Sequence, residues 1–262
     1  MHTGTKLKED IDLFNFAYGR GLTIELYDTN TKREFIDILD SLTRKAQDDA
    51  SFPVLHIEAH GSSDQQGIIL QSNEFISWTD LKPHLKNLNV ATRLNLLVVL
   101  SSCYGAHFAS HLTPSDSAPC WGLVGPTKAL KGPELLGSFS AFYQEVFASG
   151  SGGMAVEKLN ESSPKGDINY YFTDATTFFI NVYKNYLAKH CTKKAYEDRA
   201  RAMRKQLKKG NLSEIPSIGE LRRKLKSTEK DFFEKYKEKY FMIDLFPENK
   251  NRFKVTYQDV MN

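Results

Sequence analysis

The sequence has few cysteines and no long apolar run. Its three cysteines, Cys103, Cys120 and Cys191, form no CxxC pair. This pattern argues against a zinc knuckle and against a disulfide framework. No apolar segment approaches the roughly 20 residues that a membrane-spanning helix needs. The polar residues 1–10 lack the apolar core of a signal peptide, so we expect a soluble, cytoplasmic protein.

Internal repeats, low-complexity tracts and a nucleotide-binding loop are also absent from the sequence. A hydrophobic fraction of 40% excludes a disordered chain and is sufficient for a full core. The length of 262 residues suits one large α/β domain, alone or with an extension.

Charge is distributed unevenly along the chain. The net charge is +3, but residues 189–262 carry 20 Lys and Arg against 11 Asp and Glu, a surplus of +9 that leaves −6 for the rest. Residues 191–240 are predicted to form at least two charged helices, and residues 241–255 a terminal hairpin. The basic surplus is interpreted either as a solvated helical face or as a surface for nucleic acid, an anionic membrane or an acidic partner.

Strands and helices are predicted to alternate over most of the remaining chain. This order indicates a largely parallel sheet covered by helices, in which functional side chains gather at the carboxyl ends of the strands. The predicted strands cover residues 22–27, 52–59, 67–70, 94–102 and 120–126. The predicted helices begin at Thr31 and Ser77 and, further along, cover residues 135–147 and 173–187.

Two of the predicted strands end in chemically reactive side chains. One apolar run ends at His60-Gly61, and the other ends at Cys103, two residues before Gly105. Strands that neighbour each other in a parallel sheet would bring the imidazole and the thiol to the same edge. A cysteine nucleophile needs an imidazole at this position.

The cysteine at this edge has two predicted means of forming a thiolate. A free thiol has a pKa of about 8.5, so little thiolate forms at neutral pH without help. His60 would accept the proton, and a helix over residues 104–112 would direct its positive N-terminal end toward Cys103. The N–H groups of Gly61 and Cys103 would together stabilise the oxyanion of a tetrahedral intermediate.

Two other cysteine chemistries match parts of the sequence. Cys103, His107 and His111 fall at i, i+4 and i+8, a spacing that suits zinc on one helical face, although a fourth ligand is not evident. A glutamine amidotransferase also uses cysteine and histidine, but there the cysteine comes first in a G-x-C-x-G turn. Here the order is reversed and Ser101 takes the first glycine position. We expect no metal and no cofactor.

The motifs resemble those of caspase-like cysteine peptidases, most closely the bacterial CHAT group. The resemblance rests on the His-Gly strand, a helix that begins at Trp78, the strand ending in residues 101–105, and the stretch 121–126 followed by an aromatic helix. It covers roughly residues 20–190. It implies a caspase–haemoglobinase-like, three-layer α/β/α fold, with a peptidase domain over residues 1–190 and a basic, mainly helical extension over residues 191–262 packed on it.

The resemblance also implies a mechanism and assigns the catalytic roles. Cys103 would be the nucleophile and His60 the general base and acid, with the oxyanion hole at Gly61 and Cys103. Metacaspase-like relatives carry an acidic residue two positions before the cysteine, where this chain has Ser101. Glu58 or Asp64 would then be the candidates for binding a basic P1 side chain, and a neutral P1 residue stays open.

Members of the CHAT group often act in bacterial antiphage defence by cutting a pore-forming gasdermin or another toxic effector. The resemblance therefore implies a protein substrate of this kind and a separate activating protein that docks on the basic extension. Two alternatives remain: a catalytically silent caspase-like interaction scaffold, and a nucleic-acid-binding protein that uses the basic C-terminal helices.

Overall fold

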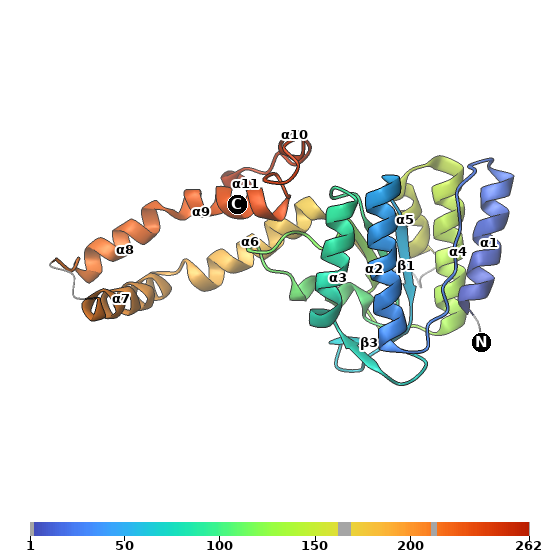
Figure 1. Ribbon diagram of the computed structural model, residues 1–262, viewed down its shortest axis with the longest axis horizontal. Helices are drawn as coiled ribbons and strands as arrows, with labels where there is room; N and C mark the ends of the chain where they lie inside the picture. The colour runs from blue at the N-terminus through green and yellow to red at the C-terminus, as the bar shows by residue number, and fades with distance from the viewer. Residues whose placement is uncertain (1–2, 162–168, 211–213, 262) are drawn as a thin grey trace. The chain divides into compact units, whose positions relative to one another are not determined.

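The computed structural model describes residues 3–161, 169–210 and 214–261 (Figure 1). The chain divides into two compact units. Unit 1 comprises Met1–His111 and Pro119–Asp174, and unit 2 comprises Leu112–Ala118 and Ala175–Asn262. The domain boundary predicted between residues 190 and 191 lies inside unit 2.

A four-stranded, mostly parallel sheet forms the centre of unit 1. Its strands are β1 (Val54–Glu58), β5 (Leu97–Ser101), β6 (Gly122–Pro126) and β7 (Tyr170–Asp174), in that order across the sheet. The first three strands run parallel, and β7 is antiparallel to β6. The predicted parallel α/β sheet is therefore present, and β7 is a strand that the sequence pattern did not reveal.

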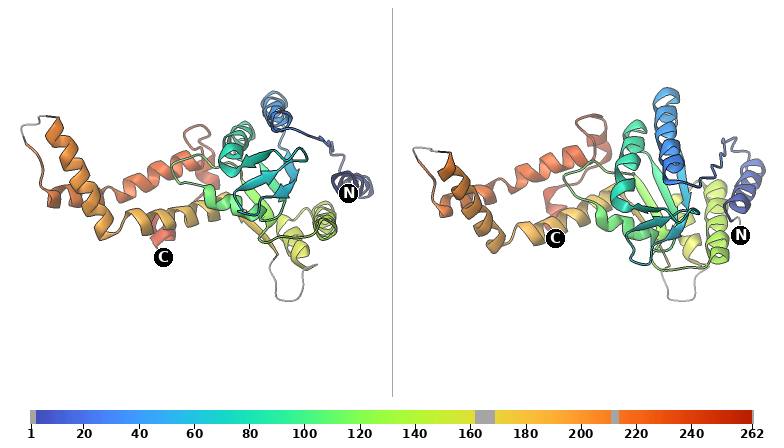
Figure 2. Two further views of the ribbon diagram at one scale, coloured as in Figure 1. Left: turned by 90° about the horizontal axis from the view of Figure 1, so that it is seen from below. Right: turned by 60° about the horizontal axis from the view of Figure 1, so that its bottom comes forward.

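Helices cover both faces of this sheet (Figure 2). On one face α1 (Thr3–Ala17), α4 (Gly132–Ser149) and α5 (Gly152–Glu161) enclose a core of apolar side chains. On the other face lie α2 (Lys32–Asp49) and α3 (Trp78–Ala91). Neighbouring residues of β5 point to opposite faces, and Val98, Val99 and Leu100 are all fully buried. Burial on both faces explains why this strand reads as a continuous apolar run.

Two helices begin where the sequence predicts, whereas α1 and α5 were not predicted. Thr31 and Glu34 form the predicted capping box at the start of α2, and the Ser77 side chain accepts a hydrogen bond from Asp80 N–H at the start of α3. Between β1 and α3 a small antiparallel sheet forms from β2 (His60–Gly61), β3 (Gly67–Ile69) and β4 (Phe75–Ser77).

Two predicted strand regions are wrong. Residues 22–27 form no strand, and Leu22, Leu26 and Tyr27 are exposed. Within the described residues β1 pairs only with β5, and the Leu22 N–H bonds to the Asn15 side chain instead of to a strand. The segment lines a cavity together with His56 and Glu58 of β1, but it does not pair with the open edge of that strand among the described residues.

The predicted terminal hairpin is likewise replaced by turns and a short helix, α10 (Asn249–Arg252). Phe241 and Met242 are fully buried, and the Phe241 ring stacks on Phe253 with centroids 4.6 Å apart. These two segments are joined by side-chain packing rather than by a backbone ladder. Apolar residues at alternating positions are compatible both with a β-hairpin and with turns joined by side-chain packing. The pattern alone therefore did not distinguish the two structures.

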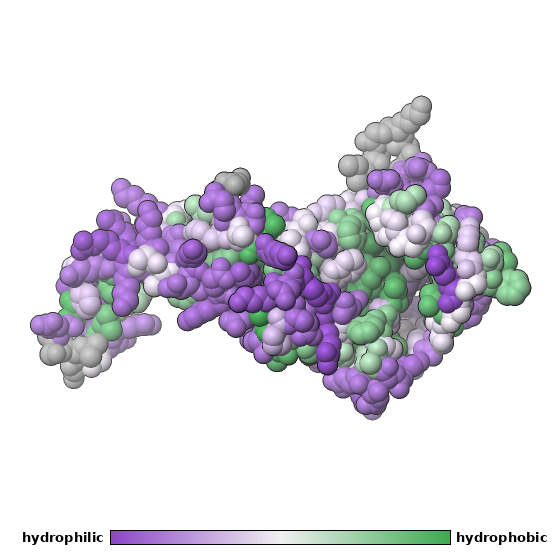
Figure 3. Space-filling view, turned by 90° about the horizontal axis from the view of Figure 1, so that it is seen from above, coloured by the Kyte–Doolittle hydropathy of each residue, from purple (hydrophilic) through white to green (hydrophobic). Residues whose placement is uncertain are grey.

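Unit 2 is helical, as predicted for most of its length. It contains α6 (Ala175–His190), α7 (Lys193–Lys209), α8 (Ile218–Ser227), α9 (Glu229–Tyr240), α10 and α11 (Tyr257–Met261). Its core is aromatic: the Phe179 ring contacts those of Tyr183, Phe233, Tyr240 and Phe241. On the face that Figure 3 draws, the α7–α8 end of unit 2 is mostly hydrophilic, with a small hydrophobic patch among the hydrophilic residues. None of the helices in the described part of the chain has the length and apolar character needed to span a membrane.

Candidate active site

The candidate catalytic residues follow the ends of two adjacent parallel strands. The last residue pair of the β1–β5 ladder is Glu58 and Ser101, and His60 and Cys103 each lie two residues further on. The Ala59 N–H donates to the Ser101 carbonyl, at 3.4 Å, which holds the two chain segments together past the ladder. Both residues therefore leave the sheet at the carboxyl edge, where side chains on neighbouring strands converge.

Gly61 packs directly on the backbone of Cys103. A Cβ atom built on Gly61 would overlap the Cys103 carbonyl oxygen and lie 2.9 Å from the Cys103 Cβ. Only a residue without a side chain allows this approach. Gly105 is crowded in the same way, since its Cβ would lie 2.7 Å from the Leu100 carbonyl oxygen. The two glycines predicted beside the reactive side chains are thus required by close contacts.

Two backbone N–H groups at this edge form no hydrogen bond with neighbouring backbone among the described residues. Ser62 N–H donates to the Gly67 carbonyl, so Gly61 and Ile68 form the next, non-hydrogen-bonded pair of the antiparallel ladder. The Gly61 N–H consequently points away from β3. Among the described residues no hydrogen bond from the Cys103 N–H is present either. Both predicted oxyanion donors are therefore unpaired by neighbouring backbone.

The thiol and the imidazole are not bonded to each other. The partly buried Cys103 thiol donates to the Leu130 carbonyl oxygen, with Sγ and O 3.6 Å apart, and His60 is exposed. The next residue, Tyr104, has a left-handed φ of 61°, and its N–H donates to the Lys128 carbonyl at 3.3 Å. The segment after β6 thus holds the Cys103 turn through two backbone carbonyls.

The sequence analysis does not predict this contact from residues 127–131. Backbone carbonyls carry no signature in the sequence, because every residue has one. A signal was nevertheless available: Gly125-Pro126 ends the third parallel strand, and the loop after it must leave the sheet at the edge that holds His60 and Cys103.

The helix after the cysteine differs from the prediction. Residues Gly105–His111 form a 3₁₀ helix, η1, rather than an α-helix over residues 104–112. With three residues per turn, side chains four apart no longer share a face, so His107 and His111 diverge. His107 instead contacts the Tyr104 ring edge-on, with centroids 5.7 Å apart. Within the described ranges no cluster of His, Cys, Asp and Glu is suited to a metal ion.

The three candidate substrate-pocket residues lie in different surroundings. Ser101 is the last residue of β5 and is 3% exposed. Asp64 is exposed in the loop between β2 and β3, where a hydrogen bond from the Ser62 side chain lowers the pKa of its carboxyl group. Neither residue shares a hydrogen bond with His60 or Cys103 among the described residues.

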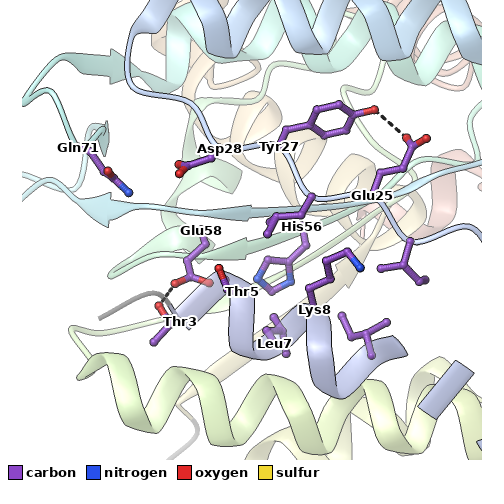
Figure 4. A pocket seen from close by; sticks show the side chains of 14 residues that line it. Thr3, Thr5, Leu7, Lys8, Glu25, Tyr27, Asp28, His56, Glu58 and Gln71 are labelled. Carbon is purple, nitrogen blue, oxygen red and sulfur yellow. Dashed lines mark hydrogen bonds between the residues drawn. The ribbon is translucent and has the colours of Figure 1, made fainter. Parts of the chain in front are cut away.

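Glu58 lines a separate cavity of about 240 Å³ (Figure 4). Its carboxylate accepts a hydrogen bond from Thr3 of α1, and His56 lies beside it. The remaining wall comes from α1, the segment 24–28 and Gln71, and neither His60 nor Cys103 contributes to it. The structure therefore does not bring Glu58 together with the two candidate catalytic side chains.

Comparison with known proteins adds no assignment: no protein-family model matches this chain, and no curated protein matches it.

Proposed function

We propose that the protein is a cysteine endopeptidase of the caspase-like type, with Cys103 as nucleophile and His60 as general base and acid. The observation that carries the proposal is the packing of Gly61 on the Cys103 backbone. It places the residue after the histidine and the cysteine itself side by side at the carboxyl edge of a parallel sheet. This is the position that nucleophilic catalysis in such a sheet requires.

The chemistry follows from the groups at this edge. His60 removes the thiol proton of Cys103, and the thiolate attacks the carbonyl carbon of the scissile peptide bond. The N–H groups of Gly61 and Cys103 donate to the resulting oxyanion. Protonated His60 gives its proton to the leaving amine, which departs and leaves a thioester. Neutral His60 then takes a proton from water, hydroxide adds to the thioester, and the Cys103 thiolate leaves and recovers the proton from His60.

The bond from the Cys103 thiol to Leu130 describes a resting state. A thiol that donates to a carbonyl retains its proton, whereas catalysis requires it to donate to the imidazole. Rotation about the Cα–Cβ bond of Cys103 to another staggered position redirects the thiol without moving the backbone. Looser geometry before substrate binds is common in catalytic groups.

The substrate class rests on the family resemblance alone. It supports a protein substrate, such as a gasdermin or another toxic effector, cut during bacterial antiphage defence. The buried Ser101 offers no charge to a P1 side chain, so a neutral P1 residue suits the site at least as well as a basic one.

The test is cleavage of a positional peptide library, together with labelling by peptides that carry a thiol-reactive warhead. The Cys103→Ala and His60→Ala variants are expected to lose cleavage and active-site labelling, while Cys191→Ser in unit 2 retains both. Circular dichroism checks that each variant is folded. Cleavage by folded Cys103→Ala would refute the peptidase. Absence of labelling in the wild type, with candidate partners added, would favour the silent scaffold.

A further inference from the structure

The basic surplus of the chain is concentrated in one helical hairpin. Helices α7 and α8 pack against each other, and together they carry 12 Lys and Arg against 3 Asp and Glu, a net charge of +9. The following helix, α9, carries four of each sign and is neutral. Since the whole chain has a net charge of +3, the hairpin contains more than the entire positive surplus of the protein.

The main apolar side chains of α7 and α8 are buried. Tyr196 and Ala200 of α7 and Leu221 of α8 are at most 7% exposed, and the Tyr196 hydroxyl donates to Glu229 of α9. Of all residues in α7 and α8, every one of which the structure describes, Met203 is the single large apolar side chain exposed, at 39%. The hairpin therefore has no second apolar stripe to insert into a membrane or to anchor a protein partner.

Exposed cations outnumber the carboxylates on the outer faces of the hairpin, and few of them form close ion pairs among the described residues. Ten Lys and Arg side chains of the hairpin are exposed, and among the described residues one of them, Arg201, forms an ion pair, with Glu197. Figure 3 shows the hydrophilic surface that results. The exposed cations are Lys193, Lys194, Arg201, Lys205, Lys208 and Lys209 on α7, and Arg222, Arg223, Lys224 and Lys226 on α8.

Several of these side chains form a straight row. Lys194, Arg201, Lys205 and Lys208 recur at i, i+7, i+11 and i+14, a spacing that keeps them on one face of α7. At a rise of 1.5 Å per residue, the ends of the row are about 21 Å apart. A row of this length spans several phosphates of a nucleic acid backbone, which is a polyanion of regular spacing.

We propose that the α7–α8 hairpin binds the phosphate backbone of nucleic acid without sequence specificity. A specific protein interface requires aromatic or aliphatic anchors at its centre, and an amphipathic membrane helix requires an exposed apolar face. The hairpin offers neither, whereas unpaired Lys and Arg on two packed helices suit phosphates directly. This binding is independent of the proposed peptidase chemistry.

The test compares two matched variants of the full chain. One neutralises Lys194, Lys205 and Lys208 of the row to Gln, and the other neutralises the exposed Lys230, Lys235 and Lys239 of α9 to Gln. Both lose three positive charges. Binding of labelled duplex DNA and of single-stranded RNA is measured by fluorescence anisotropy between about 50 and 200 mM salt. Thermal melting confirms that both variants fold.

The row variant is expected to lose about 10-fold or more in affinity, and the slope of log K against log salt to flatten by about 2 to 3. The α9 variant is expected to stay within about 3-fold of the wild type, because its lysines alternate with carboxylates. Equal losses in both variants would overturn the assignment to the hairpin. Competition by polyglutamate equal to that by DNA, or binding to phosphatidylserine vesicles without binding to nucleic acid, would overturn the choice of partner.

Discussion

The α-carbon of Gly61 lies against the carbonyl group of Cys103, with no space for a side chain between them. The two residues are 42 positions apart in sequence and belong to segments that follow different strands. Their contact fixes the histidine segment to the cysteine turn through rigid backbone rather than through flexible side chains. Neither residue's N–H bonds to neighbouring backbone among the described residues, and both residues lie at the same edge of the sheet.

Replacing Gly61 with alanine is expected to disrupt this edge. The added Cβ overlaps backbone atoms of Cys103, so no side-chain rotation relieves the clash, and one of the two segments must move. We expect a loss of about 1–3 kcal/mol in the free energy of unfolding, measured by urea denaturation. Peptide cleavage should fall more than 10-fold, since the displaced N–H groups no longer meet the oxyanion.

Gly137 in α4 supplies the control. A Cβ at Gly137 meets no atom within 4 Å, and the residue lies inside a helix, where alanine is favoured over glycine. Gly137→Ala should therefore stabilise the protein by about 0.5–1 kcal/mol. Equal stability changes in the two alanine variants would contradict the contact at Gly61.

Cysteine reactivity offers a second test. Cys120 is fully buried, and burial raises the pKa of its thiol to about 12. At pH 8 about one such thiol in ten thousand is ionised, so iodoacetamide should modify Cys120 only after unfolding. Cys103 and Cys191 are partly exposed and should react in the folded protein. Mass spectrometry of the three cysteine-containing peptides, after labelling with and without urea, shows which thiols have been alkylated.

The same labelling experiment tests the catalytic pair. If His60 accepts the Cys103 proton, His60→Ala should slow alkylation of Cys103 about 10-fold at neutral pH. Cys191 in the same sample is the internal reference and should react at an unchanged rate. A rate at Cys103 that does not depend on residue 60 would show that the imidazole has no part in forming the thiolate.

Local signals in the sequence predicted the elements around the site. The capping box at Thr31 and Glu34 and the cap at Ser77 satisfy backbone N–H groups close by in sequence, so they are readable without knowledge of the fold. The buried runs that become β5 and β6 were equally clear. Placing His60 and Cys103 after neighbouring strands followed from these elements and from the order of strands and helices.

Contacts between residues far apart in the sequence could not be predicted in the same way. Residues 22–27 have the composition of a strand but do not pair with the open edge of β1, so composition alone did not decide the pairing. Phe241 and Phe253 alternate like strand residues and instead stack on each other. The bond from the Cys103 thiol to the Leu130 carbonyl depends on how the loop after β6 folds back, which no residue type specifies.

Glu229 links three helices of unit 2. Its carboxylate accepts hydrogen bonds from the hydroxyl groups of Tyr196 in α7 and Tyr257 in α11, the latter at 2.8 Å. Glu229→Leu leaves the buried Tyr196 hydroxyl without its acceptor, so we expect a loss of about 2–3 kcal/mol in urea denaturation. Glu238→Leu on the exposed side of the same helix should change stability by less than about 0.5 kcal/mol.

The double variant Glu229→Leu/Tyr257→Phe checks that the hydrogen bond causes this loss. Tyr257→Phe alone should cost about 1 kcal/mol. Once the carboxylate is gone, removal of the Tyr257 hydroxyl should cost little more, giving a coupling energy of about 1 kcal/mol between the two sites. Fully additive losses would show that Glu229 does not act through the Tyr257 hydroxyl, which would leave the bond from Tyr196 as the source of the loss.

His56 is expected to make the folded state sensitive to acid. Its Nδ1 lies 3.0 Å from the Tyr143 hydroxyl, its Nε2 is shielded from solvent and has no partner among the described residues, and burial lowers its pKa to about 4. The unfolded state, with a pKa of about 6.5, therefore binds a proton first as the pH falls. Stability is fully present above pH 6.5 and decreases toward pH 4, by about 2–3 kcal/mol at pH 4.5. The free energy of unfolding is measured by urea denaturation at pH 7 and at pH 4.5. Between these pH values, His56→Phe should lose about 2–3 kcal/mol less than the wild type. Tyr143→Phe, which keeps the imidazole, should show the same pH dependence as the wild type. The same pH dependence in His56→Phe and in the wild type would show that other groups, such as carboxylates, control the acid response.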